Sequence, residues 1–443
     1  MEFLFSSGAM SNSQSSSVPS TPSSIEKLDF PCIDERDCCP DGGRKAWFVV
    51  LGGFLAQCST WGIMMSFNVF KDYYLSTLLA QSSTPVISAI GSLQLFLAYG
   101  LGPVVGRAFD AYGIRVLYPL GSSLAVLGLL LTSFCQENQP WQIFLTHGVM
   151  FGIGTSIMTT PPLALCNHWF DRKRPLALGI VVSGTGMGGA VFPPLLLKLI
   201  EVLGFRWAVR VCALISTVCL GLNWWLATAR LPPIGGMSLK SAVDFNGFRD
   251  CRYALAATAS CLMAYALYIP YFFIGDYADL YDVPQNIVDL LVPLTNFCGF
   301  VSRIAPAFIA TIVGPLDVLL ASSWGSAILV LGMWLPSHTA APIAVFGGLY
   351  GFFSGPFTSI MPSYVANITP QEHYGARLGM IDFFIAVATL VGPPTQGALI
   401  DPKDEDHFQH LIIFTGSTIA ASGIVLVITR LVDSRQSKSR INQ

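Results

Sequence analysis

The amino-acid sequence predicts an all-α membrane protein that crosses the bilayer about twelve times. Of its 443 residues, 53% are hydrophobic and only 11% are charged, and the mean hydropathy is +0.59. Soluble domains carry roughly 25% charged residues, so this chain has too few charged side chains to cover a water-facing surface. Apolar runs of about 20 residues recur along the chain, and a helix of that length crosses roughly 30 Å of hydrocarbon. These observations together predict a polytopic helical protein embedded in lipid.

The apolar runs fall into two halves of six spans each. Residues 1–40 precede the first run and are rich in Ser, Pro and acidic residues, which predicts a disordered cytosolic tail. The longest break, 231–250, predicts a cytosolic linker between an N-terminal six-helix bundle (41–230) and a C-terminal six-helix bundle (251–432), and 433–443 form a second cytosolic tail. The predicted spans are 46–70, 86–108, 114–134, 141–165, 175–198, 207–229, 252–275, 286–311, 316–335, 342–366, 377–400 and 409–431.

The positions of Lys and Arg predict which side of the membrane each loop faces. With a cytosolic N-terminus, 18 of the 24 Lys and Arg residues lie on the inner side and five on the outer side. Because positive residues concentrate in cytosolic loops, both termini are predicted to be cytosolic. The last residues, Ser439–Gln443, contain no retrieval or peroxisomal signal, which favours the plasma membrane and leaves vacuolar or vesicular membranes open.

Charge, cysteines and histidines argue against several other classes of function. The formal net charge of -2 offers no basic field for nucleic acid. The 11 cysteines show no pair spaced like a metal or redox motif, and His147 and His168 have no second ligand at helical spacing. The sequence shows no nucleophile with a neighbouring base, which disfavours an integral membrane enzyme such as an acyltransferase. We therefore expect no catalytic residues, no metal, no cofactor and no nucleic-acid partner.

The loop between the second and third predicted spans carries the first motif. Residues Gly106–Arg115 read GRAFDAYGIR. Gly113 permits a tight turn, and Asp110 can accept hydrogen bonds from a neighbouring helix N-terminus and pair with a basic residue. This spacing resembles the cytosolic loop signature of the major facilitator superfamily. The resemblance implies a major facilitator fold, with twelve helices in two bundles that rock about a site near the bilayer midplane, and gating roles for Asp110, Gly113 and Arg115. An ordinary charged turn that only fixes topology is the alternative.

Two further segments resemble one family within that superfamily. Asp41-Gly42-Gly43, followed by Ala46-Trp47, is similar to the entry motif of the monocarboxylate porters. Trp169–Gly179 (WFDRKRPLALG), continued by Ser183–Gly189 (SGTGMGG), is similar to their fifth-span motif. Gly204–Trp207 and Arg377–Pro394 resemble the fungal branch of that family. The resemblance implies gating roles for Arg172 and Arg174 and family-motif roles for Asp41, Gly42, Trp47, Gly179, Gly184 and Gly188.

The segment Gly184–Gly189 also satisfies the dinucleotide pattern G-x-G-x-x-G. That pattern requires a preceding strand and a helix that opens at the glycines, whereas these glycines fall inside an apolar helix that begins near Pro175. Gly184 and Gly188, four residues apart, instead let two membrane helices approach closely. We predict a packing role for them.

Two ionisable residues fall inside predicted spans, Arg303 in the eighth and Asp382 in the eleventh. A charge in hydrocarbon costs at least roughly 2.5 to 3.5 kcal/mol, which makes both residues functional candidates. By the resemblance, Arg303 occupies the position at which the porters keep an arginine that engages substrate carboxylates. A guanidinium stays charged and can bind an anion bidentately. Snorkelling of Arg303 to the cytosolic surface is the alternative.

We hypothesise that Asp382 and Arg303 form a pair. Protonation of Asp382 would then release Arg303 for an anion, which would couple transport to protons. The alternative for Asp382 is a carboxylate close enough to the membrane surface to be hydrated.

The sequence departs from the animal monocarboxylate porters at two positions. Met65 stands where those porters place a lysine in the first span, and Gly299 stands where they hold an aspartate, four residues before Arg303. Proton-linked lactate transport is therefore not expected, and a larger, partly apolar substrate is favoured.

Four uncharged polar residues inside spans complete the predicted substrate site with Arg303 and Asp382. For each of them a hydrogen bond between helices is the alternative. They are Gln57, Tyr265, Tyr268 and Asn296.

The predicted function is secondary active transport of a small organic anion or metabolite by alternating access, with efflux of a secondary metabolite as the first hypothesis. Import of a carboxylate or vitamin-like nutrient is the second. A non-transporting nutrient receptor is the third, and the short tails and the short central linker, 231–250, disfavour it. The expected partners are the lipid bilayer, a small-molecule substrate and protons.

Overall fold

The computed structural model describes residues 40–233, 245–370, 374–397 and 405–441, and every regular element within these ranges is a helix. Of the helices described, 11 are long and apolar enough to cross a membrane. A further span consists of two helices that meet at a bend of 42°. The prediction of an all-α membrane protein with about twelve spans is confirmed.

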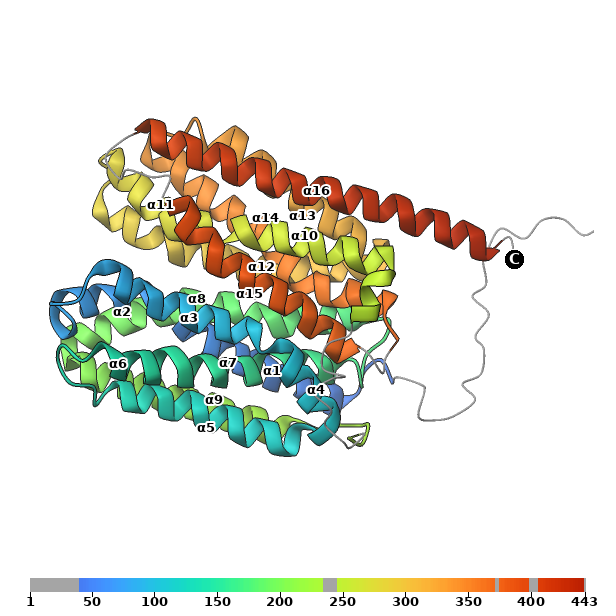
Figure 1. Ribbon diagram of the computed structural model, residues 1–443, viewed down its shortest axis with the longest axis horizontal. Helices are drawn as coiled ribbons and strands as arrows, with labels where there is room; N and C mark the ends of the chain where they lie inside the picture. Colours follow the sequence, from blue (N-terminus) through green and yellow to red (C-terminus); the bar gives the residue numbers. More distant parts are fainter. Residues whose placement is uncertain (1–39, 234–244, 371–373, 398–404, 442–443) are drawn as a thin grey trace, which may run out of the picture. The chain divides into compact units, whose positions relative to one another are not determined.

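The helices form two consecutive bundles, drawn from blue to green and from yellow-green to red in Figure 1. The N-terminal bundle contains α1 (Arg44–Met65), α2 (Phe67–Tyr73), η1 (Tyr74–Leu78), α3 (Thr84–Gly100), α4 (Gly102–Tyr112), α5 (Ile114–Thr132), α6 (Pro140–Ile143), η2 (Phe144–Met150), α7 (Phe151–Cys166), α8 (Arg174–Leu203) and α9 (Phe205–Leu226). The C-terminal bundle contains η4 (Phe245–Arg249), α10 (Cys251–Leu267), α11 (Ile269–Leu280), α12 (Gln285–Val313), α13 (Pro315–Leu329), η5 (Val330–Trp334), α14 (Ala340–Ile368), α15 (Tyr374–Gly397) and α16 (Glu405–Ile441).

Two spans are interrupted near a proline. The second span bends at Leu101, between α3 and α4, just before Gly102 and Pro103. The seventh span breaks at Tyr268, between α10 and α11, two residues before Pro270. Proline has no N–H to donate and its ring crowds the preceding turn, so each helix restarts there. Hydropathy alone does not locate these breaks, because both lie inside continuous apolar runs.

Each bundle has its own hydrophobic core, while its outward face is also apolar. Phe70 and Phe151 are fully buried in the N-terminal bundle, and Trp334 and Phe346 are fully buried in the C-terminal one. On the outside, Trp225 of α9 is 79% exposed. Large apolar side chains that face away from the core over the whole bundle belong in contact with lipid rather than water.

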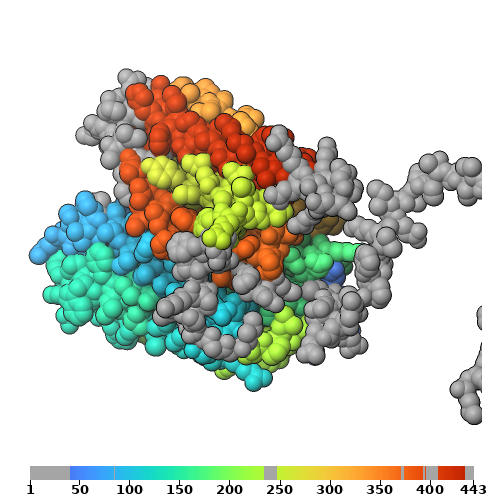
Figure 2. Space-filling model, turned by 45° about the vertical axis from the view of Figure 1, so that its right-hand side comes forward, coloured from blue at the N-terminus to red at the C-terminus, as the bar shows by residue number. Residues whose placement is uncertain are grey.

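Along α4 and α15, one of the places where the two bundles meet, almost no side chain lies between them. A methyl group added at Gly379 would stand 2.5 Å from the backbone of Gly102, and one added at Gly106 would stand 2.6 Å from the carbonyl oxygen of Gly375. Figure 2 shows α15, in orange-red, lying against α3 and α4, in blue to cyan. We call Gly102, Gly106, Gly375 and Gly379 the glycine seam. It lies toward the end of the bundles at which α1 begins, which is the predicted cytosolic end.

Some predicted segments lie outside the described residues. They are the N-terminal tail up to residue 39, linker residues 234–244, and the end of the span 377–400 beyond Gly397. The last linker residues, Phe245–Arg249, form the short helix η4. At the other end of the chain α16 continues through Ile441, so residues 433–441 of the predicted tail prolong the last span as helix.

Candidate functional site

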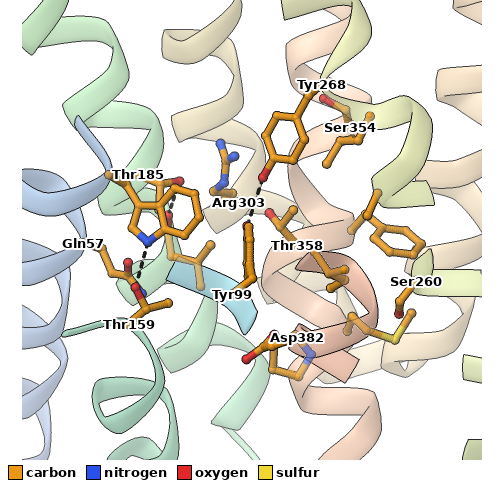
Figure 3. A pocket seen from close by; sticks show the side chains of 18 of the residues that line it. Gln57, Tyr99, Thr159, Thr185, Ser260, Tyr268, Arg303, Ser354, Thr358 and Asp382 are labelled. Atoms are coloured by element: carbon orange, nitrogen blue, oxygen red, sulfur yellow. Dashed lines mark hydrogen bonds between the residues drawn. The ribbon is translucent and has the colours of Figure 1, made fainter. Parts of the chain in front are cut away.

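A cavity lies between the two bundles, and both contribute to its wall. It holds about 1100 Å³ free of protein atoms, counting the part that opens to solvent. Figure 3 shows the side chains that surround it, with Gln57 and Thr159 from the N-terminal bundle and Ser354 and Asp382 from the C-terminal one. Five of the six predicted substrate-binding residues line this cavity: Gln57, Tyr268, Asn296, Arg303 and Asp382.

The sixth predicted residue, Tyr265, does not line the cavity. Its hydroxyl hydrogen-bonds to Oγ1 of Thr395 on α15, and its ring lies 6.1 Å from that of Phe414 on α16. Both partners belong to the C-terminal bundle. Tyr265 therefore has the role that was the alternative for the uncharged polar residues, a contact between helices of one bundle.

Arg303 projects from α12 into the cavity with a guanidinium that is only partly satisfied. Its Nε and Nη1 atoms are buried and have no hydrogen-bond partner in the described part of the chain. Gly299, one turn earlier, makes room for it, because a methyl group there would stand 2.7 Å from Nη1. With glycine at this position, Arg303 has no carboxylate neighbour one turn away on its own helix.

Asp382 lines the same cavity from α15 but does not pair with Arg303 in this conformation. No ion pair within 4.0 Å joins the two side chains, although both are described. Asp382 stands beside the glycine seam, since a methyl group at Gly102 would lie 2.9 Å from its Cβ atom. The pairing hypothesis therefore stays a prediction about another state of the protein.

Aromatic and hydroxyl groups form the rest of the polar wall. Nε1 of Trp61 donates to Oγ1 of Thr159 at 2.9 Å, inside the N-terminal bundle. The hydroxyls of Tyr99 and Tyr268, one from each bundle, lie 2.9 Å apart. Sequence reasoning did not single out Thr159 or the Tyr99 hydrogen bond, because serine, threonine and tyrosine in apolar helices also bond within their own bundle.

The predicted gating loop forms the turn between α4 and α5. Gly113 has φ of 68°, a left-handed conformation that glycine adopts without strain. Asp110 faces the start of α15, since a methyl group at Gly375 would stand 3.1 Å from its Oδ2 atom, and Nη1 of Arg107 lies 4.0 Å from the same oxygen. Arg115 is exposed. Asp110 thus lies where the bundles meet, whereas Gly113 forms the turn itself and Arg115 lies on the surface.

The two porter-like motifs contact each other although they are about 130 residues apart. Oδ1 of Asp41 accepts hydrogen bonds from the backbone N–H groups of Asp171 at 2.6 Å and Lys173 at 3.3 Å. The ring of Trp47 meets that of Phe170 edge-on at 5.2 Å. Gly42, with φ of 154°, lies in the short connection between Asp41 and the start of α1. The first motif therefore braces the turn that leads into α8.

The predicted gating arginines of the second motif differ in their surroundings. Arg172 is exposed. Arg174 is largely buried, donates to Oδ1 of Asp171 at 3.0 Å, and lines another pocket with Asn367 and Tyr374 of the C-terminal bundle. Arg174 thus lies beside residues of the opposite bundle, where it could respond to movement between the bundles.

The glycines of α8 pack against two different helices. At Gly184 and Gly188 an added methyl group would collide with the backbone of α1, at Phe54 and Cys58. Gly179 faces the opposite bundle, where the carbonyl of Arg303 on α12 occupies the space a methyl group would need. All of these glycines lie inside one continuous helix, so the dinucleotide pattern has no preceding strand here. Helix packing is the role that their surroundings support.

A comparison with protein families identifies the fold. The family model described as Major Facilitator Superfamily matches residues 49–311 and 254–443.

Curated relatives of similar length come from fungi. The MFS transporter asaE of Aspergillus flavus is 31% identical over 399 residues, which is 90% of each chain. The aspyridones efflux protein apdF of Emericella nidulans is 32% identical over 405 residues, covering 91% of this chain and 81% of that protein.

Among solved structures, the crystal structure of a bacterial homologue of the iron transporter ferroportin in an outward-facing state is similar in fold. It matches 88% of this chain and 100% of its own with a TM-score of 0.66. The sequence identity is 15%, so the likeness concerns the fold alone.

Proposed function

This chain belongs to the Major Facilitator Superfamily, and we propose that it exports a small organic anion with a largely apolar body by alternating access. Its relatives are named transporters, in line with the prediction that the chain is not an enzyme. The observation that carries the proposal is Arg303, whose Nε and Nη1 atoms are buried without partners beside a cavity between the bundles.

The charge of Arg303 supports an anion as substrate. Placing a guanidinium at this depth costs free energy that a partner of opposite charge offsets. A bidentate carboxylate or enolate could accept hydrogen bonds from the Nε and Nη1 atoms that now lack acceptors. An anion also restores electroneutrality in a site where solvent screening is weak.

The remaining wall supports an apolar body on that anion. Trp61, Phe357 and Met361 face the cavity together with aliphatic side chains. Such surfaces bind rings and hydrocarbon through burial of apolar area. Met65, which stands where animal porters place a lysine, is part of the same wall. A two- or three-carbon acid would leave most of this surface uncovered.

Asp382 supports coupling to protons. One basic and one acidic side chain face the same largely apolar cavity, Arg303 and Asp382. When Asp382 is ionised it competes with an incoming anion for the field of Arg303, and when it is protonated that competition ends. Proton uptake on one side of the membrane would then favour anion binding there.

The direction of transport is inferred from the relatives. The protein apdF is named an efflux protein for aspyridones, which supports export of a secondary metabolite here. Import of a carboxylate or vitamin-like nutrient would use the same cavity. Removing the gene from the producing cells separates the two: an exporter's loss retains its product inside the cells, whereas an importer's loss leaves the nutrient in the medium.

Transport in proteoliposomes tests the role of Arg303 with a panel of aromatic carboxylates such as indole-3-acetate. We expect Arg303→Gln to reduce transport about 10- to 100-fold, because a hydrogen bond to a charged group contributes about 1.5 to 3 kcal/mol. Lys198→Gln is the matched control, since Lys198 is exposed and pairs with Glu201. Equal rates for Arg303→Gln and the unaltered protein would contradict the proposal.

We further propose that the chain is monocarboxylate porter-like and resides in the plasma membrane with both termini cytosolic. The contact of Asp41 with the backbone of Asp171 and Lys173 supports the resemblance to monocarboxylate porters, because the two motifs that carry this resemblance contact each other. An epitope added after Gln443 tests the orientation. Antibody should reach it only after the cells are permeabilised.

A further inference from the structure

One hydrogen bond between side chains joins the two bundles across the cavity. It connects the hydroxyl of Tyr99, near the end of α3, with that of Tyr268, at the break between α10 and α11, at 2.9 Å. Figure 3 shows the two rings pointing toward each other from opposite walls. The ring of Trp61 lies 4.9 Å from that of Tyr99 and backs it from the N-terminal side. We call Trp61, Tyr99 and Tyr268 the aromatic contact.

The aromatic contact lies farther from the predicted cytosolic end than the two charged residues do. At 1.5 Å per helical residue, Tyr268 is about 26 Å from the start of α10 and Tyr99 about 20 Å from the end of α4. Arg303 is about 15 Å from the end of α12, and Asp382 about 12 Å from the start of α15. Along their helices the two tyrosines are therefore farther from the predicted cytosolic end than Arg303 and Asp382 are, and Figure 3 shows the guanidinium of Arg303 beside their hydrogen bond.

Both tyrosines are attached to helix breaks. Tyr99 lies two residues before Leu101, where α3 and α4 meet at 42°. Tyr268 is itself the residue between α10 and α11, and its N–H bonds only to the carbonyl of Ala266. Proline follows each break, at Pro103 and Pro270. A broken helix can bend without losing further backbone hydrogen bonds. Tyr99 can therefore move with α3, and Tyr268 with α11.

We propose that the hydrogen bond between Tyr99 and Tyr268 is the outer gate of the cavity, and that it opens by movement of α3 and α11 at the two breaks. The proposal rests on alternating access as the proposed function. Of two bonded hydroxyls, only one donates to the other, so one hydroxyl hydrogen stays available for an acceptor on a passing anion. Substrate or water can replace the tyrosine partner without leaving a hydroxyl unsatisfied.

Access to the cavity from outside tests the gate without any substrate. Ala264 lines the cavity one helical turn before Tyr268. In an Ala264→Cys protein whose native cysteines are replaced by serine, the rate of labelling by a membrane-impermeant maleimide on intact cells reports opening. A neutral hydrogen bond of ordinary strength shifts an equilibrium about 2- to 10-fold. We expect Tyr99→Phe and Tyr268→Phe each to raise the labelling rate by that factor.

The double variant and a matched control sharpen the test. Tyr99→Phe/Tyr268→Phe should label no faster than the faster single variant, because both changes remove the same bond. Tyr74→Phe removes a hydrogen bond to Nδ1 of His147 inside the N-terminal bundle, with neither residue in α3 or α11, and should leave labelling unchanged. Should one single variant fail to fold, the other removes the same bond.

Two results would overturn the proposal. Unchanged labelling in both single variants would mean that the tyrosines do not restrict access. Additive increases would mean that they act separately rather than as one bond. Neither result depends on the substrate, so a wrong substrate assignment and a wrong gate assignment give different outcomes.

Discussion

Two of the contacts between the bundles differ in their chemistry: the glycine seam lies toward the predicted cytosolic end, and the aromatic contact lies farther from it. In the glycine seam, backbone meets backbone, with less than a methyl group of free space at Gly102 and Gly379. In the aromatic contact, two long side chains meet through one hydrogen bond. A close-packed seam loses many contacts at once when it separates, whereas a single hydrogen bond can be exchanged for another partner. The described conformation thus has a close-packed backbone contact toward the predicted cytosolic end and an exchangeable side-chain contact farther from it.

The largest expected effect comes from breaking the seam. We expect Gly379→Val to abolish transport and to destabilise the described conformation by about 3 kcal/mol or more, because the added atoms would overlap the backbone of Gly102 and Pro103. Labelling of Ala264→Cys in inside-out vesicles measures opening toward the predicted cytosolic end, and it should rise. Gly221→Ala is the control, since nothing lies within 4 Å of an added methyl group at Gly221. Transport at the normal rate would show that the seam tolerates separation.

Asp382 lies between the glycine seam and the aromatic contact. A variant without its carboxyl group tests whether the alternate opening of these two contacts is coupled to protons. We expect Asp382→Asn to reduce pH-driven transport at least about 10-fold while exchange without a pH gradient continues, because asparagine cannot carry a proton. The comparison is uptake into proteoliposomes with and without the gradient. Asp289→Asn is the matched control, an exposed carboxylate at the start of α12. Unchanged proton dependence would remove the coupling hypothesis.

The next prediction concerns the hydrogen bonds of Asp41, which hold the turn before α8 within the N-terminal bundle. It tests how much these bonds contribute to stability. We expect Asp41→Asn to lower the free energy of unfolding by about 1 kcal/mol, because a charged acceptor becomes a neutral one for the N–H groups of Asp171 and Lys173. Asparagine tolerates the positive φ of 48° at this position. Thermal unfolding in detergent measures the change, with Glu201→Gln as control on an exposed pair. Equal melting temperatures would mean that the contact adds no stability.

The smallest expected effect concerns Asp250, which caps the N-terminus of α10. This helix contacts the glycine seam's helix α15, because Tyr253 of α10 donates to the carbonyl of Arg377, two residues before Gly379. Burial raises the pKa of Asp250, but hydrogen bonds and the charge of Arg252 lower it by more, so the net pKa lies below its ordinary value. A lowered folded-state pKa stabilises the protein above the unfolded pKa of about 3.9, and this stability is lost as the pH falls through the folded value.

Asp250→Asn keeps the helix cap and removes the titration. We expect the variant to melt slightly below the unaltered protein at pH 7, by a few tenths of a kcal/mol because solvent screens this partly exposed pair. The difference should shrink as the pH falls below the unfolded pKa of about 3.9 and vanish once Asp250 is protonated in the folded protein as well. A difference that persists at low pH would point to packing rather than charge.

Several elements of the site were predictable because local rules decide them. Gly113 was expected to form a tight turn, and its φ of 68° does so. The breaks at Leu101 and Tyr268 have a local signal too, Pro103 and Pro270, although hydropathy hides it. For Tyr265, local rules did not predict the correct role. Its chemistry and depth match those of Tyr268, yet it bonds Thr395 within its own bundle. Only the packing of α10 against α15 separates the two residues.

The sequence by itself determined that lipid surrounds the chain, how many times it crosses, and which residues carry charge at depth, because the cost of polar groups in hydrocarbon acts on each segment separately. Tertiary structure decided which side chains share the cavity, that Arg303 and Asp382 stay apart in this conformation, and that Tyr99 meets Tyr268. Those relations join residues that are far apart in the sequence. They depend on how closely two helices pack, and at the seam that distance is set by glycines whose partners no local pattern identifies.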